Sequence, residues 1–215
     1  MSNRKINNTQ QQQEEFIENC RYLGLKLLAE GYRQMVDRAN KHTIGYYEFI
    51  SDIVQAEAAD KQQRRIEYLV KNSRLPYPLK MLADFDFDFQ PKLKRKLIMD
   101  LASLGFIERN ESILLIGDNG TGKSHLARSL ALMACQGGYK TYYTTCSELI
   151  NDLNAGVYEK TLDKRMRKYI NPELLLIDEM GHDRLELQVI KEAHLLFKVI
   201  DQRYKDNKSL IFTTN

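Results

Sequence analysis

The chain has 215 residues, of which 43% are hydrophobic and 28% are charged, and its formal net charge is +3. This composition is typical of a globular protein, and it excludes a collagen-like chain, a low-complexity chain and a small disulfide-stapled protein. No apolar run reaches the roughly 18 to 20 residues of a membrane-spanning helix, and the N-terminus does not have the pattern of an export signal, so we expect a cytoplasmic protein without a membrane segment.

The first segment, residues 1–15, is rich in Asn and Gln and has few side chains to bury. Its low hydrophobicity predicts a disordered start. From Phe16 onward, apolar residues recur at steps of three and four through residue 39, which is the spacing of one side of a helix. We therefore expect a core-facing helix over residues 16–39.

A second, longer helix is expected over residues 44–74. Thr43 is a suitable N-cap for it, and two prolines shortly after it end it. Its apolar side comprises Tyr47, Ile50, Val54 and Ala58. Ion pairs are expected one helical turn apart, joining Glu57 with Lys61, Asp60 with Arg64 and Glu67 with Lys71. We therefore expect a small all-α domain that binds DNA or a partner over residues 16–75. Over residues 76–110 we expect a linker that contains a helix before the next domain.

Beyond residue 110 the sequence alternates between apolar strands and helices. Strands are expected over residues 112–117, 140–146, 173–178 and 209–215. Helices are expected over residues 123–136, over 147–153 with Ser147 as N-cap, and over 187–204. Because parallel strands need crossover connections, this alternation predicts an α/β fold with a parallel sheet flanked by helices. The chain ends on an apolar strand, so we expect residues 111–215 to be a truncated domain.

This α/β domain begins with a phosphate-binding loop. Residues 117–124 read GDNGTGKS and match the pattern G-x-x-x-x-G-K-[ST], directly after an apolar strand and at the start of a helix. The glycines let consecutive backbone N–H groups turn toward a phosphate, and the helix N-terminus adds partial positive charge. Lys123 can bring its ammonium group to the β- and γ-phosphates of ATP, and Ser124 can offer a hydroxyl to Mg²⁺. The predicted nucleotide-binding residues are Gly117, Asp118, Asn119, Gly120, Thr121, Gly122, Lys123 and Ser124.

Two acids follow the third predicted strand, at the end of the strand where ligands bind in parallel sheets. Asp178 is expected to hold Mg²⁺ through water, and Glu179 to polarise the water that attacks the γ-phosphate, as an ATP hydrolase requires. Asn215, at the end of the fourth strand, can hydrogen-bond that water or the phosphate. The predicted catalytic residues are Lys123, Glu179 and Asn215, and the predicted metal ligands are Ser124 and Asp178.

Three segments in this order and spacing, GDNGTGKS, LLLIDE and SLIFTTN, resemble the motifs of AAA+ ATPases of the DnaC/IstB branch. In that branch the third segment carries the sensor 1 asparagine, which corresponds to Asn215. The helical region adds YYEFI at 46–50, QAEAA at 55–59 and DFDF at 84–87, which resemble the N-terminal pattern of IstB-type insertion-sequence ATP-binding proteins. The resemblance covers nearly the whole chain after residue 15.

The resemblance implies an ATPase that binds double-stranded DNA, assembles with ATP into a homo-oligomer, and recruits or stimulates a partner transposase. The AAA+ core over residues 111–215 lacks the strand and arginine finger that the family has after sensor 1, and it lacks a sensor 2 arginine. Arg184 and Arg203 are candidates for reaching the nucleotide of a neighbouring subunit, and surface ion pairing is the alternative role for both.

The net charge alone is too small to indicate a nucleic-acid-binding protein, so DNA contacts must come from local clusters. One cluster has little local compensation and comprises Lys160, Lys164, Arg165, Arg167 and Lys168. A second cluster, near the end of the long helix, includes Arg64 and Arg65. If the first cluster contacts phosphates, changing Lys164, Arg165 and Lys168 to Ala weakens DNA binding and flattens its salt dependence.

Asp and Phe alternate over residues 84–89. The three rings either fill the seam between the domains or place one ring near adenine, in which case Phe87→Ala lowers the affinity for ATP while the fold stays intact.

Three other functions fit parts of the same pattern. A DnaC-like replicative helicase loader shares the three ATPase motifs and differs in the partner that residues 1–80 engage. A small-molecule P-loop kinase would consume ATP only with an acceptor and would need no oligomer. A switch would bind ATP without hydrolysing it.

Overall fold

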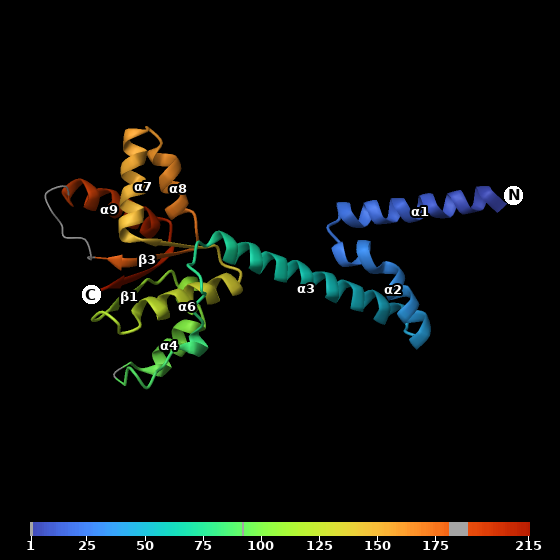
Figure 1. Cartoon of the computed structure of the whole chain (residues 1–215), viewed down its shortest axis with the longest axis horizontal. Helices are drawn as coiled ribbons and strands as arrows, with labels where there is room; N and C mark the ends of the chain where they lie inside the picture. The colour runs from blue at the N-terminus through green and yellow to red at the C-terminus, as the bar shows by residue number, and fades with distance from the viewer. Residues whose placement is uncertain (1, 92, 181–188) are drawn as a thin grey trace. The chain divides into compact units, whose positions relative to one another are not determined.

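In the computed structural model, residues 2–91, 93–180 and 189–215 are described, and the chain divides into two units, Met1–Arg65 and Ile66–Asn215 (Figure 1). The first unit contains α1 (Ser2–Tyr22), α2 (Lys26–His42) and most of α3 (Tyr46–Asn72). The last turns of α3 belong to the second unit.

The N-terminal helices differ from the prediction in two places. Helix α1 begins at Ser2, where the sequence predicts disorder over residues 1–15. Low hydrophobicity indicates that a segment has little to bury, but it does not prevent backbone hydrogen bonding, and Gln, Glu, Lys and Arg have good helix propensity. The helix predicted over residues 16–39 is divided between α1 and α2, because Gly24 adopts a left-handed conformation with a φ of 75°.

The partly buried side of α3 is not the predicted one. Phe49 and Ile53 line a small cavity together with Met35 of α2. Three residues of the predicted core side are instead at least 60% exposed: Tyr47, Ile50 and Val54. Both sets have helical spacing, so the sequence could not show which of them packs.

Two polar residues of the first unit take roles other than the predicted ones. Thr43 follows α2 as its C-cap, with a left-handed φ of 51°, and does not cap α3. Glu57 is 6% exposed and accepts a hydrogen bond of 2.6 Å from the backbone N–H of Leu28, where an ion pair with Lys61 was expected. Glu57 thus satisfies an amide at the start of α2, which has no acceptor within that helix.

The second unit is built on a sheet with the strand order β1-β4-β3-β2, in which every neighbouring pair is parallel. The strands are β1 (Ile113–Ile116), β2 (Thr141–Thr145), β3 (Leu174–Met180) and β4 (Ser209–Thr214). The helices are η1 (Leu82–Asp84), α4 (Arg95–Ala102), α5 (Gly105–Glu108), α6 (Lys123–Gln136), α7 (Cys146–Tyr158), α8 (Leu162–Ile170) and α9 (Val189–Lys205). Figure 1 shows α6 on one side of the sheet and α7 with α8 on the other, so the predicted α/β fold with a flanked parallel sheet is confirmed.

Alternate residues of β3 pack into two cores. Leu174 and Leu176 join the core on the α6 side, whereas Leu175 and Ile177 join the core formed by α7, α8 and α9. All four side chains are fully buried. Burial on both faces explains why this strand is a continuous apolar run and does not alternate between polar and apolar residues.

The boundary between the units lies at residues 65/66 and not at 75/76 as predicted. The reason is that Leu69 and Leu75, at and after the end of α3, are buried in the core of the second unit. Over the described ranges of the chain, no helix combines the length and the apolar character that a membrane crossing requires.

Two helices of the second unit also differ from the prediction. Helix α7 is capped by Thr145 and not by Ser147, because Thr145 Oγ1 accepts a hydrogen bond of 3.2 Å from the backbone N–H of Glu148. Helix α8 lies in a stretch that the sequence presented only as a cluster of charge.

Candidate functional site

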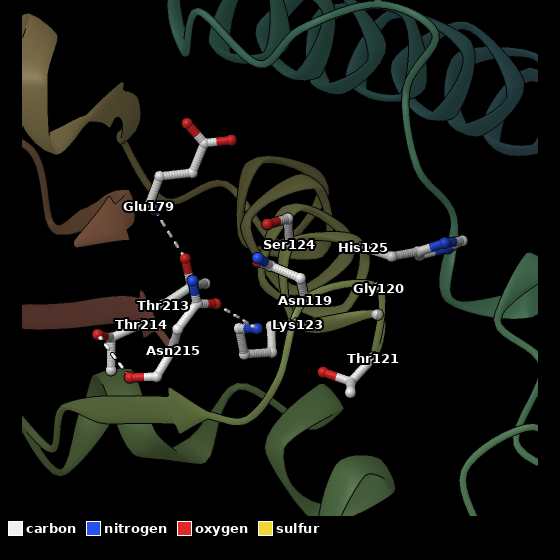
Figure 2. A pocket seen from close by; sticks show the side chains of 11 residues that line it. Asn119, Gly120, Thr121, Lys123, Ser124, His125, Glu179, Thr213, Thr214 and Asn215 are labelled. Carbon is white, nitrogen blue, oxygen red and sulfur yellow. Dashed lines mark hydrogen bonds between the residues drawn. The ribbon is translucent and has the colours of Figure 1, made fainter. Parts of the chain in front are cut away.

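The predicted site residues meet at one edge of the sheet. Strand β4 lies between β1 and β3, so the loop after β1, the acids at the end of β3 and the end of β4 come together at the carboxyl ends of the strands. A pocket of about 290 Å³ opens there (Figure 2). Its lining residues are Asn119, Gly120, Thr121, Gly122, Lys123, Ser124, His125, Glu179, Thr213, Thr214 and Asn215. The three predicted catalytic residues thus line one pocket with most of the predicted loop.

The loop ends in a conformation that only glycine adopts easily. Thr121 donates its hydroxyl to the carbonyl oxygen of Asp118 at 2.8 Å, which closes the turn. Gly122 is the N-cap of α6 and has a φ of 86°, and a Cβ at this position would lie 2.6 Å from the ring of Phe85. Both the left-handed backbone and the contact therefore require glycine. The first turn of α6, whose amides have no acceptor within the helix, begins at the pocket.

Lys123 is folded back over its own loop. Its Nζ donates to the backbone carbonyls of Gly117 at 2.5 Å and of Asp118 at 2.8 Å. It also donates to Oδ1 of Asn215 at 3.0 Å, which links the loop to the end of β4 (Figure 2). Phosphate oxygens carry more negative charge than these carbonyl and amide oxygens, so they can compete for the ammonium group.

Asp178 is fully buried, and each of its carboxylate oxygens has two partners. Oδ1 accepts hydrogen bonds from the hydroxyls of Ser124 at 2.8 Å and Thr213 at 2.5 Å. Oδ2 accepts from the guanidinium of Arg128 at 2.8 Å and from the hydroxyl of Tyr143 at 3.3 Å. Burial opposes ionisation, but the hydrogen bonds and the charge of Arg128 outweigh it and hold the pKa of Asp178 below its usual value. Asp178 is therefore a carboxylate at neutral pH.

Glu179 occupies an irregular position in β3. Its φ is 62°, and the pairing of β3 with β4 shifts between Ile177 and Met180. A bulge of this kind turns a side chain out of the regular alternation of the strand. The side chain of Glu179 is exposed and lines the pocket, while its backbone N–H donates to Thr213 Oγ1 at 2.9 Å (Figure 2).

The rings of residues 84–89 belong to the second unit, where Phe85 packs against the phosphate-binding loop. Phe85 is 8% exposed, and its ring meets the ring of His125 edge-on at a centroid distance of 5.5 Å. Phe87 packs on Phe85 at 5.0 Å, and Arg95 lies over the Phe87 ring at 5.1 Å. Of the rings proposed from the sequence, Phe85 therefore makes the contact with the loop.

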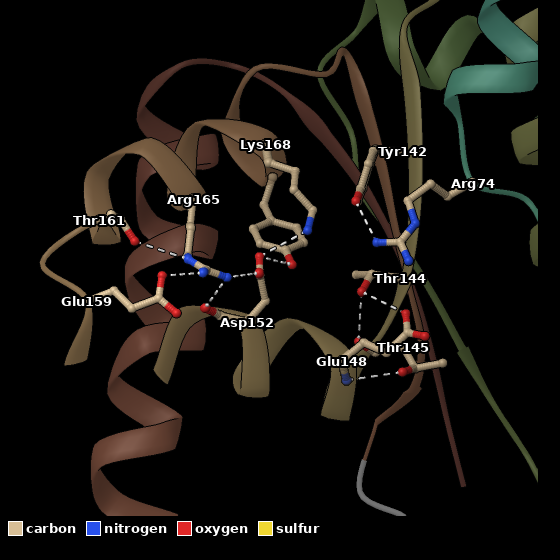
Figure 3. Close-up of polar contacts among 11 residues, drawn as sticks. Arg74, Tyr142, Thr144, Thr145, Glu148, Asp152, Glu159, Thr161, Arg165 and Lys168 are labelled. Atoms are coloured by element: carbon tan, nitrogen blue, oxygen red, sulfur yellow. Dashed lines mark hydrogen bonds and ion pairs between the residues drawn. The ribbon is translucent and has the colours of Figure 1, made fainter. Parts of the chain in front are cut away.

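The predicted basic cluster lies on α8 and just before it, and part of its charge is compensated (Figure 3). Arg165 pairs with Asp152 at 2.5 Å and with Glu159 at 2.7 Å. Lys168 pairs with Asp152 at 3.0 Å. The prediction of little local compensation is therefore wrong for Arg165 and Lys168, because acids of α7 and the residue after it face α8.

Three members of the cluster are exposed: Lys160, Lys164 and Arg167. They line an open groove of about 860 Å³ between the end of α7 and α8, together with Gly156 and Leu162. The other predicted basic residues, Arg64 and Arg65, lie on α3, where Arg64 forms the expected ion pair with Asp60 at 2.7 Å.

Arg203 is a buried residue and not a surface one, with an exposed fraction of 0%. Its guanidinium donates to the backbone carbonyls of Tyr169, Ile170, Pro172, Glu173 and Ser209. Burial lowers the pKa of Arg203 to about 10. Both predicted roles, a surface ion pair and a contact with a neighbouring subunit's nucleotide, are wrong for Arg203 because the side chain is fully buried and its two terminal nitrogens donate to backbone carbonyls inside the fold. Arg184 lies outside the described residues.

Sequence reasoning missed three side chains that hold Asp178, namely Arg128, Tyr143 and Thr213. Arg128 lies four residues after Ser124 on α6, which places both on one side of the helix. Thr213 lies two residues before Asn215, at the end of β4. These spacings were available in the sequence, but without the strand order they could not be related to Asp178.

Residues 19–215 match the family of IstB-like ATP binding proteins. The putative ATP-binding protein of insertion sequence IS5376 from Geobacillus stearothermophilus is 41% identical over 202 residues, which cover 94% of this chain and 78% of the relative. The putative ATP-binding protein of insertion sequence IS21 from Pseudomonas aeruginosa is 33% identical over 193 residues, which cover 90% of this chain and 71% of the relative.

Two solved structures show related folds. The DnaC helicase loader is 26% identical with a TM-score of 0.50, over 56% of this chain and 67% of that chain. AMPPCP-bound DnaA from Aquifex aeolicus is 19% identical with a TM-score of 0.54, over 66% of this chain and 43% of that chain, and supports the fold alone. The protein has an AAA+ fold with a phosphate-binding loop, and it belongs to the family of IstB-like ATP-binding proteins.

Proposed function

We propose that this protein is an ATP-dependent transposition helper that hydrolyses ATP, binds double-stranded DNA, assembles into a homo-oligomer and recruits or stimulates a partner transposase. The observation that carries the proposal is the convergence of Lys123, Asp178, Glu179 and Asn215 at the carboxyl ends of three neighbouring strands. The relatives are named as ATP-binding proteins of insertion sequences, which supports the connection to transposition.

The residues at this edge fit a Mg²⁺ ion. Mg²⁺ prefers oxygen ligands, and the hydroxyl of Ser124 lies 2.8 Å from the ionised carboxylate of Asp178. Ser124 and Asp178 would hold the ion, Asp178 through water. Bound Mg²⁺ would neutralise charge on the β- and γ-phosphates.

ATP is the substrate of the proposed reaction. The ammonium group of Lys123 would leave the carbonyls of Gly117 and Asp118 and bind phosphate oxygens. Glu179 would accept a proton from a water molecule while the oxygen of that water attacks the γ-phosphorus. The bond from the γ-phosphorus to the bridging oxygen of the β-phosphate would break, which gives ADP and phosphate. Asn215 would orient the water or the phosphate.

The adenine would lie near the contact between Phe85 and the loop. Phe87 packs on Phe85 at 5.0 Å, and its ring is only partly buried, so it can reach a base. Phe87→Ala should therefore lower the affinity for ATP without unfolding the protein. An unaltered affinity would exclude this ring from the base site.

DNA is proposed to bind along the groove between α7 and α8. The exposed cations of that groove, Lys160, Lys164 and Arg167, can contact successive phosphates of a nucleic acid. Arg165 and Lys168 form internal ion pairs with Asp152 and lie outside the proposed set of DNA contacts. Arg64 and Arg65 on α3 are further proposed DNA contacts.

The size of the protein in solution tests the proposal. We expect the chain mixed with double-stranded DNA to form larger assemblies with ATP than with ADP or without nucleotide, as measured by light scattering after gel filtration. Lys123→Ala should remove the ATP-dependent increase. Assemblies of equal size under all three conditions would contradict the proposed role of ATP.

A helicase loader is the second candidate, because the DnaC helicase loader is 26% identical over 67% of its own chain. The two candidates share the ATP site and differ in the partner protein. Capture experiments with the intact chain as bait would decide between them: a purified cognate transposase retained in the presence of ATP supports the transposition helper, whereas a retained replicative helicase supports the loader.

A further inference from the structure

Thr213 connects the two acids of the candidate site through a single hydroxyl group. Its Oγ1 donates a hydrogen bond to Oδ1 of Asp178 and accepts one from the backbone N–H of Glu179 at 2.9 Å. The residue is 1% exposed, so water is not available to replace either bond. One threonine on β4 therefore fixes two successive residues of β3.

The strand register explains why a side chain is needed there. Ile177 pairs with Phe212, and Met180 pairs with Thr214. Between these pairs, β3 has two residues and β4 has only Thr213, which is the arrangement of a β-bulge. The bulge takes the N–H of Glu179 out of the regular ladder, and the threonine hydroxyl provides its acceptor. The left-handed φ of 62° at Glu179 is thus held by a specific hydrogen bond.

The other oxygen of Asp178 is fixed independently. Arg128 on α6 donates to Oδ2 at 2.8 Å, and Tyr143 on β2 donates its hydroxyl to the same oxygen at 3.3 Å. Because Arg128 holds Oδ2, the position of Oδ1 depends on Thr213 and Ser124. When Ser124 turns its hydroxyl to a metal ion, Thr213 is the remaining hydroxyl donor to Oδ1 in the described part of the chain.

We propose that Thr213 is a positioning residue for both acids: it holds the carboxylate of Asp178 toward Ser124 and the backbone of Glu179 at the edge of the pocket. The inference rests on the proposed ATP site and goes beyond it. It assigns a new role to Thr213, which lies outside the phosphate-binding loop: Thr213 couples metal binding by Asp178 to water activation by Glu179. Residues of this kind around a metal site typically change metal affinity or activity by about 10- to 100-fold when they are replaced.

Binding of AMPPCP with and without Mg²⁺ tests this role independently of turnover. In Thr213→Val, which keeps the shape and removes the hydroxyl, we expect the affinity measured in EDTA to stay within about twofold of the parent. The gain in affinity caused by Mg²⁺ should fall by about tenfold. In ATP hydrolysis, kcat should fall by about tenfold or more with a smaller change in KM.

Two matched variants isolate the hydroxyl group. Thr213→Ser keeps the hydroxyl and should restore both the gain caused by Mg²⁺ and kcat. Thr144→Val removes the hydroxyl of another buried strand threonine, which donates to the backbone of Thr145, and should behave like the parent. If Thr213→Val unfolds, Thr213→Cys replaces it, because a thiol is only a weak hydrogen-bonding group.

Three results would overturn the assignment. The first is a folded variant without the hydroxyl in which Mg²⁺ raises the AMPPCP affinity as much as in the parent. The second is a Thr213→Ser variant that loses as much of this Mg²⁺-dependent gain as Thr213→Val. The third is a loss of AMPPCP affinity in EDTA as large as the loss with Mg²⁺, which would indicate general damage to the pocket. A parent chain that binds no AMPPCP would instead contradict the proposed function, and this is seen before any variant is compared.

Discussion

The pocket at the ends of β1, β3 and β4 and the segment formed by α7 and α8 both concentrate charged side chains, but they use them differently. At the pocket, Lys123 emerges from a backbone turn and faces a cavity. On α8, Arg165 and Lys168 face acids contributed by α7 and the turn after it. The sequence motif placed Lys123 in the phosphate-binding loop. The sequence did not show that Arg165 and Lys168 pair with acids of a neighbouring helix.

Arg203 extends this comparison to the interior. It is fully buried, and its two terminal nitrogens donate to five backbone carbonyls around the end of α8 and the starts of β3 and β4. Charges used inside the fold should control stability, and charges that face the pocket or the groove should control binding. The following variants separate these two effects.

The largest effect on stability is expected for Arg203→Met, which keeps a long side chain but removes every donor. The bonds to the carbonyls of Tyr169 and Ser209 are buried, so we expect their loss to lower the free energy of unfolding by about 3 kcal/mol in urea titrations. Arg109→Met removes an exposed arginine that pairs with Glu111 and should leave the unfolding midpoint unchanged. Equal midpoints for the two variants would show that the buried hydrogen bonds contribute little.

A smaller and pH-dependent effect is expected for Asp152→Asn. Burial opposes ionisation of Asp152, but hydrogen bonds from Tyr169, Lys168 and Arg165 outweigh it and lower its pKa. A lowered folded-state pKa stabilises the fold above the unfolded-state value of about 4 and stops doing so as the pH falls through the folded-state value. The variant should thus lose about 1 to 2 kcal/mol at pH 7, measured by urea unfolding, and the difference should shrink below about pH 4. A difference that is constant down to pH 2 would contradict the ion-pair explanation.

Removal of the cations of the groove should have the smallest effect on stability. It should weaken DNA binding instead. Changing Lys160, Lys164 and Arg167 to Ala should weaken binding to double-stranded DNA and reduce the slope of log affinity against log salt by up to about 0.9 for each lost phosphate contact. Fluorescence anisotropy at several salt concentrations measures this slope.

A charge-matched control distinguishes a specific groove from the general charge of the protein. Lys140, Lys198 and Lys205 are exposed and lie outside the groove. Changing these three residues to Ala removes the same net charge and should leave the salt slope close to that of the parent. Equal slopes for the two triple variants would exclude the groove as the DNA site.

Much of the α/β unit could be predicted because its signals are local. Helix α6 spans Lys123–Gln136 as expected, since a glycine lies at each end, and the strand order brought most of the predicted loop, Glu179 and Asn215 to one pocket. The bulge at Glu179 could not be predicted, because an apolar run followed by two acids does not show where the register between β3 and β4 shifts.

The helical unit was harder to predict because several of its signals were ambiguous. Apolar spacing continues across Gly24, so it did not locate the end of α1. Two apolar stripes of α3 compete, and only the contacts with α2 show which one is covered. Helix α8 has apolar residues at helical spacing, including Leu162 and Met166, but its charges dominated the interpretation.

The most direct test of the account is calorimetric titration of the folded chain with MgATP. We predict measurable binding to the parent and an affinity at least about 100-fold weaker for Lys123→Ala, which corresponds to about 2.7 kcal/mol. Lys160→Ala, which removes a lysine from the groove, should bind MgATP like the parent. Absence of binding to the well-folded parent, or equal affinity in Lys123→Ala, would contradict the assignment of the pocket as an ATP site.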